Sequence, residues 1–506
     1  MSVIHLHFMK SNKEALEIIV NIEKNVAVDE IEFRDIKIWP LIRLEIWKQL
    51  THVKKENDVK NITKHRVSYF FSKILIIFSY LKHALFEEKY EESDAVFLSS
   101  PNNRWEKVDG KYFRSFLNSM RDILKELGFE SVILDIATKE QRPVYEENYF
   151  ILKKIESICS MYRIINFFKT ILNLNKQTDM IYNWDALIRF TVSKYPELSS
   201  LDKQSIIERA NKILFCEKIF KKILEQIKPK ICFLECYYNP ISMGYIKACR
   251  SLGIRTVEIQ HSQQDLGVMY ISWTRIPKNG YSLLPAVWWC WGKKSANTIN
   301  EWSNKIYPEH RAIIGGNPWL AKNLNGDYKI DYIHTGKLMD LSENKTNVLV
   351  ALQPIEPILS TNLMESITNS PQNINWLIRL HPAIYTQMSK IKNQLKDISN
   401  KNVEVEYSSE MPLFNLLKKV DFMITSWSGV AYEALMFGVH PIIIHPNGKN
   451  AFKEYIEQNL FTYAPSSQEI IGVLKQNKSE FNFKESTPYM ETNVGKMKEI
   501  IIDLLK

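Results

Sequence analysis

The chain has 506 residues, of which 45% are apolar and 24% charged, and its formal net charge is +9. One hydrophobic core does not fill this length, so we expect at least two domains, and the composition excludes wholesale disorder. The positive charge is spread along the chain and permits an anionic partner. Because it forms no Arg/Gly-rich tract or aromatic-studded basic repeat, it argues against a nucleic-acid partner.

The first 92 residues predict a mostly helical N-terminal extension. They lack the apolar core and cleavage site of a secretory signal, so we expect a cytoplasmic protein. The apolar stretch Val67–Phe86 is interrupted by Lys73, Lys82 and His83, and charges are costly at the centre of a bilayer. Two interpretations stay open: a helix packed on the body of the protein, or an amphipathic helix in a membrane interface. A membrane span fits less well.

From residue 93 short apolar strands alternate with amphipathic helices. The strands are expected at Ala95–Ser100, Ser131–Ile136 and Lys230–Tyr238. This alternation predicts a parallel sheet with crossover helices. We therefore assign residues 93–335 to an N-terminal Rossmann-like domain, with a helical insertion at about 146–226.

The cysteines are few and scattered, and no second pair completes a zinc site with Cys232 and Cys236. They predict free thiols, buried in a reducing compartment. The six are Cys159, Cys216, Cys232, Cys236, Cys249 and Cys290.

A polar connector, Leu324–Thr346, separates the first domain from a more regular second half. Residues 345–480 repeat strand and helix about five times, and residues 481–506 predict a C-terminal helix. The fold class expected is α/β, with two doubly wound Rossmann-like domains that face each other across a cleft.

Polar residues follow the strands of the second domain, and ligands of open parallel sheets bind at those carboxyl ends. Small hydroxyl groups, with a glycine that opens a helix, offer a phosphate backbone N–H groups and the helix dipole. We predict a donor-binding site there, formed by Gln353, Arg379, His381, Pro382, Ser426, Ser428, Gly429 and Glu433.

The most specific of these strand ends is Arg379-Leu380-His381-Pro382. Pro382 disfavours helical geometry at His381 and keeps it extended, which aims the imidazole toward the cleft as a clamp for a leaving phosphate. Arg379 lies two residues earlier and points to the same side of an extended strand. Two roles stay open for Arg379: binding the phosphate, or pairing structurally with a carboxylate.

The first domain offers three candidates for the catalytic base: Glu235, Glu258 and His261. Their position at the ends of strands favours His261 and Glu235, whereas Glu258 lies within a strand and fits a buried structural role as well. The sequence contains no well-placed Asp-x-Asp pair, so we expect no metal and no cofactor.

The segment Pro412–Ile444 resembles the nucleotide-binding half of GT-B glycosyltransferases. In that family a Ser/Gly loop holds the phosphates of the donor, which implies this role for Ser426, Ser428 and Gly429. A glutamate of the following helix binds the ribose there, which implies Glu433. Taken singly, the two serines fit helix caps better, and Glu433 fits a surface position of a helix better. Together with Gly429 and the segment Gly438-x-His440-Pro441, they favour the binding role.

Three further segments carry weaker resemblances. Residues 379–382 are similar to the His-Pro motif of bacterial sialyltransferases, Kdo transferases and CDP-glycerol polymerases. Gly253–Ser262 resembles the Glu-x-Gln-His-Gly turn of polysaccharide-assembly transferases, with Ser262 where the glycine stands. Ile36–Trp47 is similar to the same group.

These resemblances imply a metal-independent GT-B glycosyltransferase of capsule or O-antigen assembly. Its donor would be a nucleotide sugar, CMP- or UDP-linked, and its acceptor a surface glycan or lipid-linked molecule at the inner face of the cytoplasmic membrane. The large helical insertions favour a bulky acceptor. The alternatives are a nucleotide-sugar 2-epimerase, a CDP-glycerol-type glycerophosphotransferase and a degenerate, non-enzymatic scaffold. The polar strand ends argue against the last.

Overall fold

The structure, a computed structural model, describes most of both halves of the chain. The predicted apolar helix Val67–Phe86 and residues 152–179 of the predicted insertion lie outside the described residues. The described residues are 10–51, 89–99, 105–136, 149–151, 180–262, 267–328, 344–396, 402–476 and 490–506, with the single residues 145, 264, 330, 341 and 398. Within them, no helix is both long enough and apolar enough to cross a membrane.

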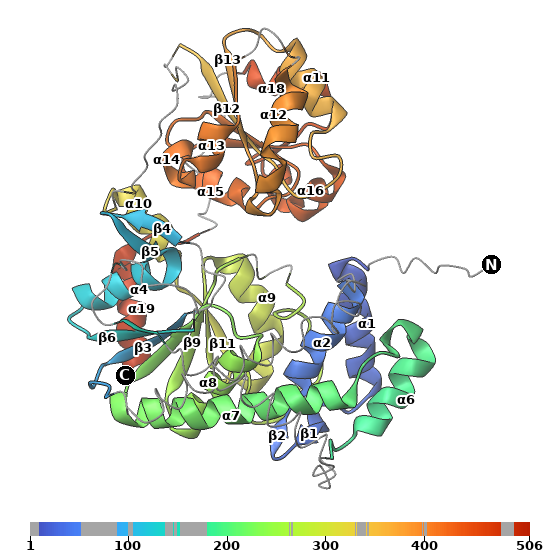
Figure 1. The fold of residues 1–506 in the computed structure, drawn as a ribbon, viewed down its shortest axis with the longest axis vertical. Coiled ribbons are helices and arrows are strands. Elements are labelled where there is room, and N and C mark those ends of the chain that lie inside the picture. Colours follow the sequence, from blue (N-terminus) through green and yellow to red (C-terminus); the bar gives the residue numbers. More distant parts are fainter. Residues whose placement is uncertain are drawn as a thin grey trace, which may run out of the picture. The chain divides into compact units, whose positions relative to one another are not determined.

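The chain forms two compact units (Figure 1). The first contains Met1–Trp105, Arg114–Trp319 and Asn493–Lys506, and the second contains Glu106–Phe113 and Leu320–Thr492. The chain therefore passes between the units at Trp319–Leu320 rather than in the predicted connector Leu324–Thr346. The predicted N-terminal extension is not separate either, because its helices belong to the core of the first unit.

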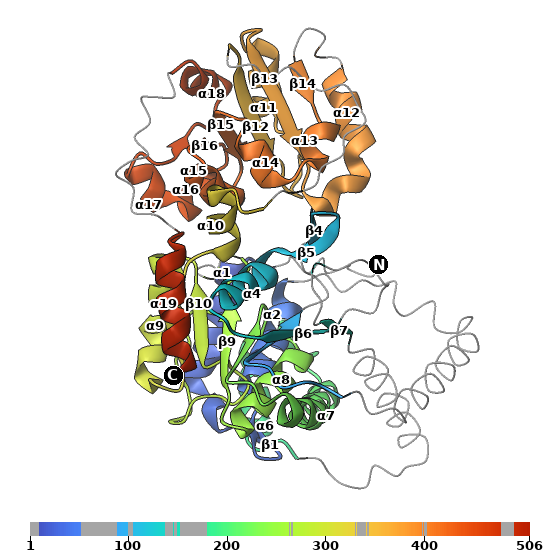
Figure 2. The same cartoon turned by 90° about the vertical axis from the view of Figure 1, so that its left-hand side faces the viewer.

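Two segments join a unit that their place in the sequence did not predict. The hairpin β4 (Trp105–Val108) and β5 (Lys111–Arg114) contributes to the second unit, where Val108 pairs with Ile330 and the Phe113 ring packs on Tyr328. The C-terminal helix α19 (Val494–Leu505) returns to the first unit (Figure 2). It packs on α4 (Ser115–Glu126), where Lys498 Nζ lies 2.9 Å from a Glu126 carboxylate oxygen.

The first unit is built on a seven-stranded sheet in the order β11-β10-β9-β8-β3-β6-β7, in which all neighbouring strands are parallel. The order reverses between β3 and β8, the first and fourth strands along the chain, which is the doubly wound arrangement. The strands are β3 (Ala95–Ser99), β6 (Ser131–Asp135), β7 (Tyr149–Ile151), β8 (Ile231–Leu234), β9 (Arg255–Ile259), β10 (Val287–Cys290) and β11 (Arg311–Ile314).

Helices flank this sheet, and a short hairpin of β1 (Glu32–Phe33) and β2 (Ile36–Lys37) precedes it. Helices α7 and α8 pack closely, because a Cβ on Gly244 would lie 2.6 Å from the Cys216 Cβ. The further helices are α1 (Asn12–Asn25), η1 (Val28–Glu30), α2 (Trp39–Thr51), α6 (Trp184–Lys194), η3 (Pro196–Leu198), α7 (Lys203–Ile227), α8 (Pro240–Ser251), α9 (Lys293–Ser303), η4 (Asn304–Ile306) and α10 (Pro318–Asn325).

The second unit is built on a six-stranded parallel sheet in the order β14-β13-β12-β15-β16-β17. Along the chain this order reads 3-2-1-4-5-6, the arrangement of dinucleotide-binding domains, with the reversal between β12 and β15. The predicted fold class of two doubly wound domains is therefore confirmed. The strands are β12 (Thr346–Ala351), β13 (Ile374–Arg379), β14 (Asn402–Glu404), β15 (Phe422–Thr425), β16 (His440–Ile443) and β17 (Thr462–Tyr463).

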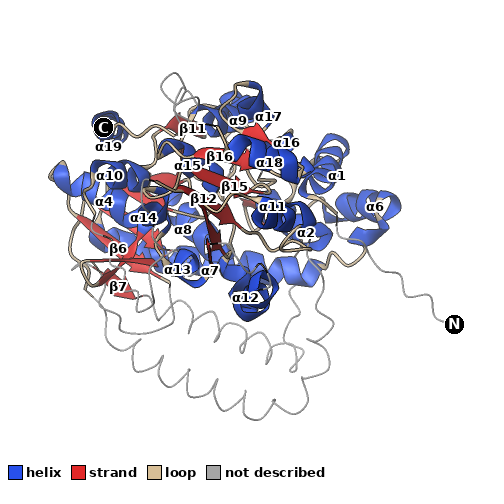
Figure 3. Cartoon of the chain, turned by 90° about the horizontal axis from the view of Figure 1, so that it is seen from above, coloured by secondary structure: helices blue, strands red, loops and turns tan. Residues whose placement is uncertain are grey.

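Helices pack on both faces of these strands, as the crossovers of a parallel sheet require (Figure 3). The strand centres carry the core, in which Val350, Ile378 and Ile424 lie on neighbouring strands. The helices are α11 (Thr361–Asn369), η5 (Pro382–Gln387), α12 (Met388–Lys396), α13 (Glu406–Glu410), α14 (Leu413–Leu417), α15 (Val430–Met436), α16 (Pro446–Ala451), α17 (Lys453–Glu457) and α18 (Ser467–Leu474).

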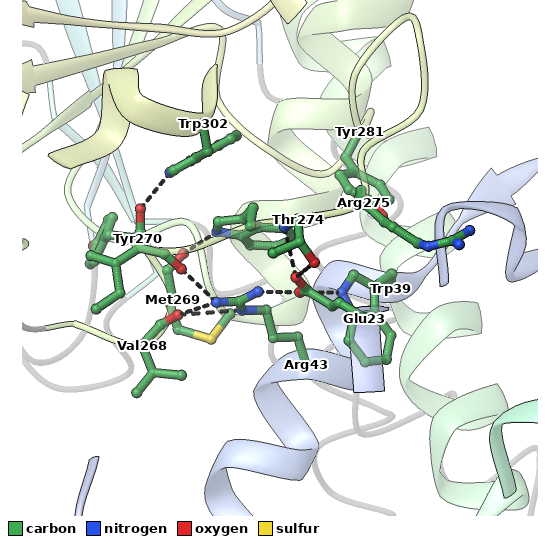
Figure 4. A network of polar contacts seen from close by, with 12 residues as sticks. Glu23, Trp39, Arg43, Val268, Met269, Tyr270, Thr274, Arg275, Tyr281 and Trp302 are labelled. Carbon is green, nitrogen blue, oxygen red and sulfur yellow. Dashed lines mark hydrogen bonds and ion pairs between the residues drawn. The ribbon is translucent and has the colours of Figure 1, made fainter. Parts of the chain in front are cut away.

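A buried ion pair attaches the N-terminal helices to the rest of the first unit (Figure 4). Arg43 of α2 is paired with Glu23 of α1, and both side chains are fully buried. The Arg43 guanidinium also donates to the carbonyl oxygens of Val268, at 2.9 Å, and Ile271, at 2.7 Å. Thr274 donates to the second Glu23 oxygen through its N–H and its hydroxyl, so both charges have several hydrogen-bond partners.

We predict that Arg43→Ala lowers the free energy of unfolding by about 3–5 kcal/mol, because it leaves the Glu23 carboxylate buried without its counter-charge. Chemical denaturation measures the loss. The control is Lys453→Ala, which removes an exposed ion pair with Glu457 and should cost less than about 1 kcal/mol. Equal losses in the two variants would contradict the proposed role of the buried pair.

Candidate functional site

Each sheet has one point at which the strand order reverses, and ligands of doubly wound domains bind beside it, at the carboxyl ends of the strands. In the second unit this point lies between β12 and β15, and in the first unit between β3 and β8. Polar side chains gather at both points. They form a pocket in the second unit and a buried charged cluster in the first.

The pocket of the second unit has a volume of about 230 Å³ and lies at the ends of β12, β15 and β16. Its lining combines amide, hydroxyl and imidazole groups with one indole ring, that of Trp427. Among the described residues that line it, Glu356 is the one carboxylate, and no lysine or arginine takes part. The polar lining residues are Gln353, Ser360, Thr425, Ser426, His445 and Asn447.

The loop after β15 is shaped by hydrogen bonds within the unit. The Gln353 side-chain oxygen accepts from the N–H of Trp427 at 2.7 Å, and the Thr425 hydroxyl accepts from the N–H of Ser428 at 3.2 Å. The Ser428 hydroxyl accepts from the N–H of Val430 at 3.3 Å. Three N–H groups of the predicted phosphate loop thus have partners in the protein. The groups that this loop presents to the pocket are the side chains of Ser426 and Trp427.

Gly429 opens α15, as predicted, but its backbone is helical, with φ of −59° and ψ of −19°. A Cβ added to it would meet no atom within 4 Å, so neither conformation nor packing requires glycine at this position. The helix it opens has seven residues, and Glu433 lies within it as a buried side chain.

A His-Pro pair ends two strands of the second sheet, and both histidines cap the element that follows. His381 precedes Pro382 of η5, and its Nδ1 accepts from the N–H of Ala383 at 3.1 Å. His445 precedes Pro446 of α16, and its Nδ1 accepts from the N–H of Asn447 at 3.1 Å. An acceptor role for Nδ1 means that the neutral ring carries its proton on Nε2. Capping therefore explains why a hydrophobic strand ends in His-Pro.

The two histidines differ in their surroundings. His381 is exposed, whereas His445 is half-buried, lines the pocket and packs edge-on against Trp427, with ring centroids 4.7 Å apart. Arg379 donates to the carbonyl oxygens of Ser408, at 2.8 Å, and Met411, at 2.5 Å. It thereby fixes the end of the short helix α13.

Of the predicted donor residues, the pocket lining includes Gln353 and Ser426. It leaves out Arg379, His381, Pro382, Ser428, Gly429 and Glu433. It adds Trp427, His445 and Asn447, which also follow strands of this sheet but were not among the predicted donor residues. For His445, the signal in the sequence is a second His-Pro pair, at the end of the fifth strand.

In the first unit, the reversal of strand order is occupied by a buried charged cluster. Arg114 donates to Asp135 at 2.5 Å, and the Ser99 hydroxyl donates to the other Asp135 oxygen. Burial lowers the pKa of the Arg114 guanidinium, and the charges of Asp135 and Glu235 oppose that shift. Glu235 is thus placed beside a cation. Arg114 and Asp135 were not predicted, although Asp135 ends a predicted strand.

The other two predicted base candidates lie at β9. Glu258 is fully buried, and its Oε1 accepts from the Tyr270 hydroxyl at 2.7 Å. Burial raises the pKa of Glu258 to about 8, and the hydrogen bond from Tyr270 opposes the shift. His261 is half-buried just past the strand, with its ring centroid 6.4 Å from that of Tyr238.

The turn that contains His261 does not require glycine. Ser262 has no positive φ, and its carbonyl oxygen accepts from the Gln260 side chain at 2.8 Å. No group of three or more His, Cys, Asp or Glu side chains suited to a metal ion occurs within the described ranges.

No protein-family model matches this chain, and no curated protein matches it. Solved structures similar to it include the UDP-GlcNAc 2-epimerase of Neisseria meningitidis bound to UDP-GlcNAc, with 12% identity over 81% of this chain and 98% of that chain and a TM-score of 0.47. The UDP-GlcNAc 2-epimerase of Methanocaldococcus jannaschii has 12% identity, covers the same shares and scores 0.45. Anabaena HepE in complex with UDP and glucose has 11% identity over 82% and 99%, with a score of 0.41. The sequence identities and TM-scores of these structures are too low to carry an argument. The evidence for two doubly wound domains is therefore the strand order of this chain itself.

We predict that Glu258→Gln stabilises the protein increasingly as the pH rises from about 5 to 8. The pKa of Glu258 is raised from an ordinary value of 4.5 to about 8, so in this window the unfolded chain releases a proton that the folded protein keeps. The wild type therefore loses stability with rising pH, and a glutamine does not titrate. Thermal unfolding measures the difference, with the exposed Glu457→Gln as the control. A difference independent of pH would contradict the assignment.

Proposed function

We propose that the protein is a GT-B glycosyltransferase that transfers a sugar from a nucleotide-activated donor to a surface glycan or lipid-linked acceptor. The observation that carries the proposal is the pocket beside the reversal of strand order in a 3-2-1-4-5-6 sheet. This position is where doubly wound domains bind nucleotides.

The lining of the pocket suits the parts of a nucleotide sugar. The Trp427 indole offers a flat surface for a base or a sugar ring. Gln353, Asn447 and Ser426 offer donors and acceptors for hydroxyl groups. His445, with its Nε2–H, supplies a donor for a phosphate oxygen. Such fixed donors stabilise the charge that develops on a leaving phosphate, which supports a mechanism without a metal.

The first unit supplies groups suited to activating an acceptor hydroxyl. His261 is half-buried and can take a proton in the neutral form. Glu235 is the second candidate, and its carboxyl group lies near the Arg114 guanidinium. His381 and Arg379 stay in the proposal as residues beside the donor site, with His381 as the group that stabilises the charge on the leaving phosphate in the transition state.

Two other reactions would use the same donor pocket. A nucleotide-sugar 2-epimerase would convert the donor without any acceptor, and a CDP-glycerol-type enzyme would transfer glycerol phosphate. Incubation of each candidate donor with and without a glycan acceptor separates them. Consumption of the donor that requires the acceptor and releases the nucleotide supports the transferase. A new epimer formed without acceptor would replace this proposal with the epimerase.

We predict that one nucleotide among CMP, CDP, UDP, GDP and ADP binds the full chain in calorimetric titrations, and that His445→Ala weakens its binding roughly tenfold to a hundredfold. A hydrogen bond to a charged group contributes about 1.5–3 kcal/mol, which corresponds to that range. His381→Ala is the matched variant, because it removes the same kind of cap at a residue outside the pocket lining. We expect it to lower turnover more than nucleotide affinity.

The result that would contradict the donor pocket is a His445→Ala variant that binds the nucleotide as tightly as the wild type. Melting temperatures of the two variants show whether the loss of the cap, about 1 kcal/mol in each, is comparable. If none of the five nucleotides binds the folded chain, the proposed function fails.

We extend the proposal to contact with the inner face of the cytoplasmic membrane through Val67–Phe86, whose apolar run is flanked by Lys64, His65 and Arg66. We predict flotation with liposomes that contain anionic lipid and release at high salt. Liposomes of neutral lipid are the control. Equal recovery in the soluble fraction with both lipid compositions would count against membrane contact.

A further inference from the structure

The segment after β9 contains a turn whose four consecutive carbonyl groups all accept hydrogen bonds from side chains. Arg43 donates to Val268 and Ile271, and Trp302 donates to Tyr270 at 2.7 Å (Figure 4). Met269 accepts from the Tyr237 hydroxyl and from Trp273 at 3.2 Å. We call residues 268–271 the braced turn.

The carbonyl groups of the braced turn have hydrogen bonds from more elements than their burial alone requires. Buried carbonyl groups need partners, but water or one neighbouring strand would satisfy them. Here the donors come from α2, from the segment after β8, from α9 and from residue 273 of the same loop. Since these elements lie far apart in the sequence, the position of the braced turn is fixed by the whole of the first unit.

The braced turn places one side chain, that of Tyr270, between a buried acid and an aromatic group next to His261. The Tyr270 hydroxyl donates to Glu258 at 2.7 Å. The Tyr270 ring meets the Tyr238 ring edge-on, with centroids 5.9 Å apart. The Tyr238 ring in turn lies 6.4 Å from the His261 ring. A continuous series of contacts thus runs from Glu258 to the imidazole.

We propose that Tyr270 is a positioning residue for His261: Glu258 holds its hydroxyl group, and its ring fixes Tyr238, against which the imidazole packs. The catalytic part of this inference depends on the proposed function, in which His261 acts on the acceptor. A base must lie within hydrogen-bond reach of the proton it removes, so a shift of the ring costs rate even when every reacting group is present.

The test is Tyr270→Phe, which removes the hydroxyl and leaves the ring. The matched control is Tyr245→Phe, because Tyr245 is equally buried in the same unit and its hydroxyl donates to the carbonyl of Val96 at 3.2 Å. We expect kcat to fall roughly tenfold or more in Tyr270→Phe with the KM for the donor unchanged, since the donor pocket lies in the second unit. Tyr245→Phe should leave both constants unchanged.

A second readout does not depend on any activity. In the full chain labelled with ¹³C-histidine, the His261 ring resonances, assigned with His261→Gln, should shift in Tyr270→Phe and stay in place in Tyr245→Phe. Two further variants test the acid. Glu258→Gln keeps an oxygen that can accept from Tyr270 and should preserve the resonances, whereas Glu258→Leu should shift them as Tyr270→Phe does.

His261 resonances that are unchanged in Tyr270→Phe, or that shift equally in Tyr245→Phe, would overturn the proposal. Shifted resonances in a protein that transfers no sugar would uphold the contact series while the proposed function fails. The two hypotheses are therefore separable in one set of variants.

Discussion

The buried pair of Glu23 and Arg43 is the constraint on which the first unit depends. A buried guanidinium is tolerated when it is paired and hydrogen-bonded, and Arg43 donates to one carboxylate and two carbonyl groups. Its cation also lies 4.3 Å from the centroid of the Trp273 ring. The N-terminal helices and the braced turn, 225 positions apart at Arg43 and Val268, are therefore held as one body. Moving either would leave a charge buried without its partners.

Arg43 holds the braced turn, and Tyr270 of that turn contacts Glu258, one of the candidate site residues. The braced turn brings the Tyr270 hydroxyl to Glu258, and burial of that carboxyl raises its pKa to about 8. Glu258 thus lies within the packing of the unit, while His261 past the end of the strand is half-buried. In this arrangement the carboxyl group is enclosed by protein, whereas the imidazole is partly exposed to solvent.

In the second unit, the same histidine cap occurs after two different strands. His381 and His445 both cap the element after their strand, so His-Pro at a strand end is explained by local hydrogen bonding alone. What distinguishes them is position. His445 follows β16 and lines the pocket beside Trp427, whereas His381 follows β13 and is exposed. The motif therefore shows which local geometry forms, and the strand order decides which of the two histidines lines the pocket.

The sequence by itself determined the two doubly wound domains, because alternating apolar strands and amphipathic helices leave a parallel sheet as the way to bury both. It also placed Gln353 and Ser426 at strand ends, since the end of an apolar run is visible locally. Only the tertiary structure shows that β4 and β5 join the second unit and that α19 joins the first. The sequence could not show this, because an amphipathic face does not reveal which core it covers. The tertiary structure alone brought together Arg114 with Asp135 and Tyr270 with Glu258, since pairing between distant segments depends on how the strands are ordered and not on any local pattern.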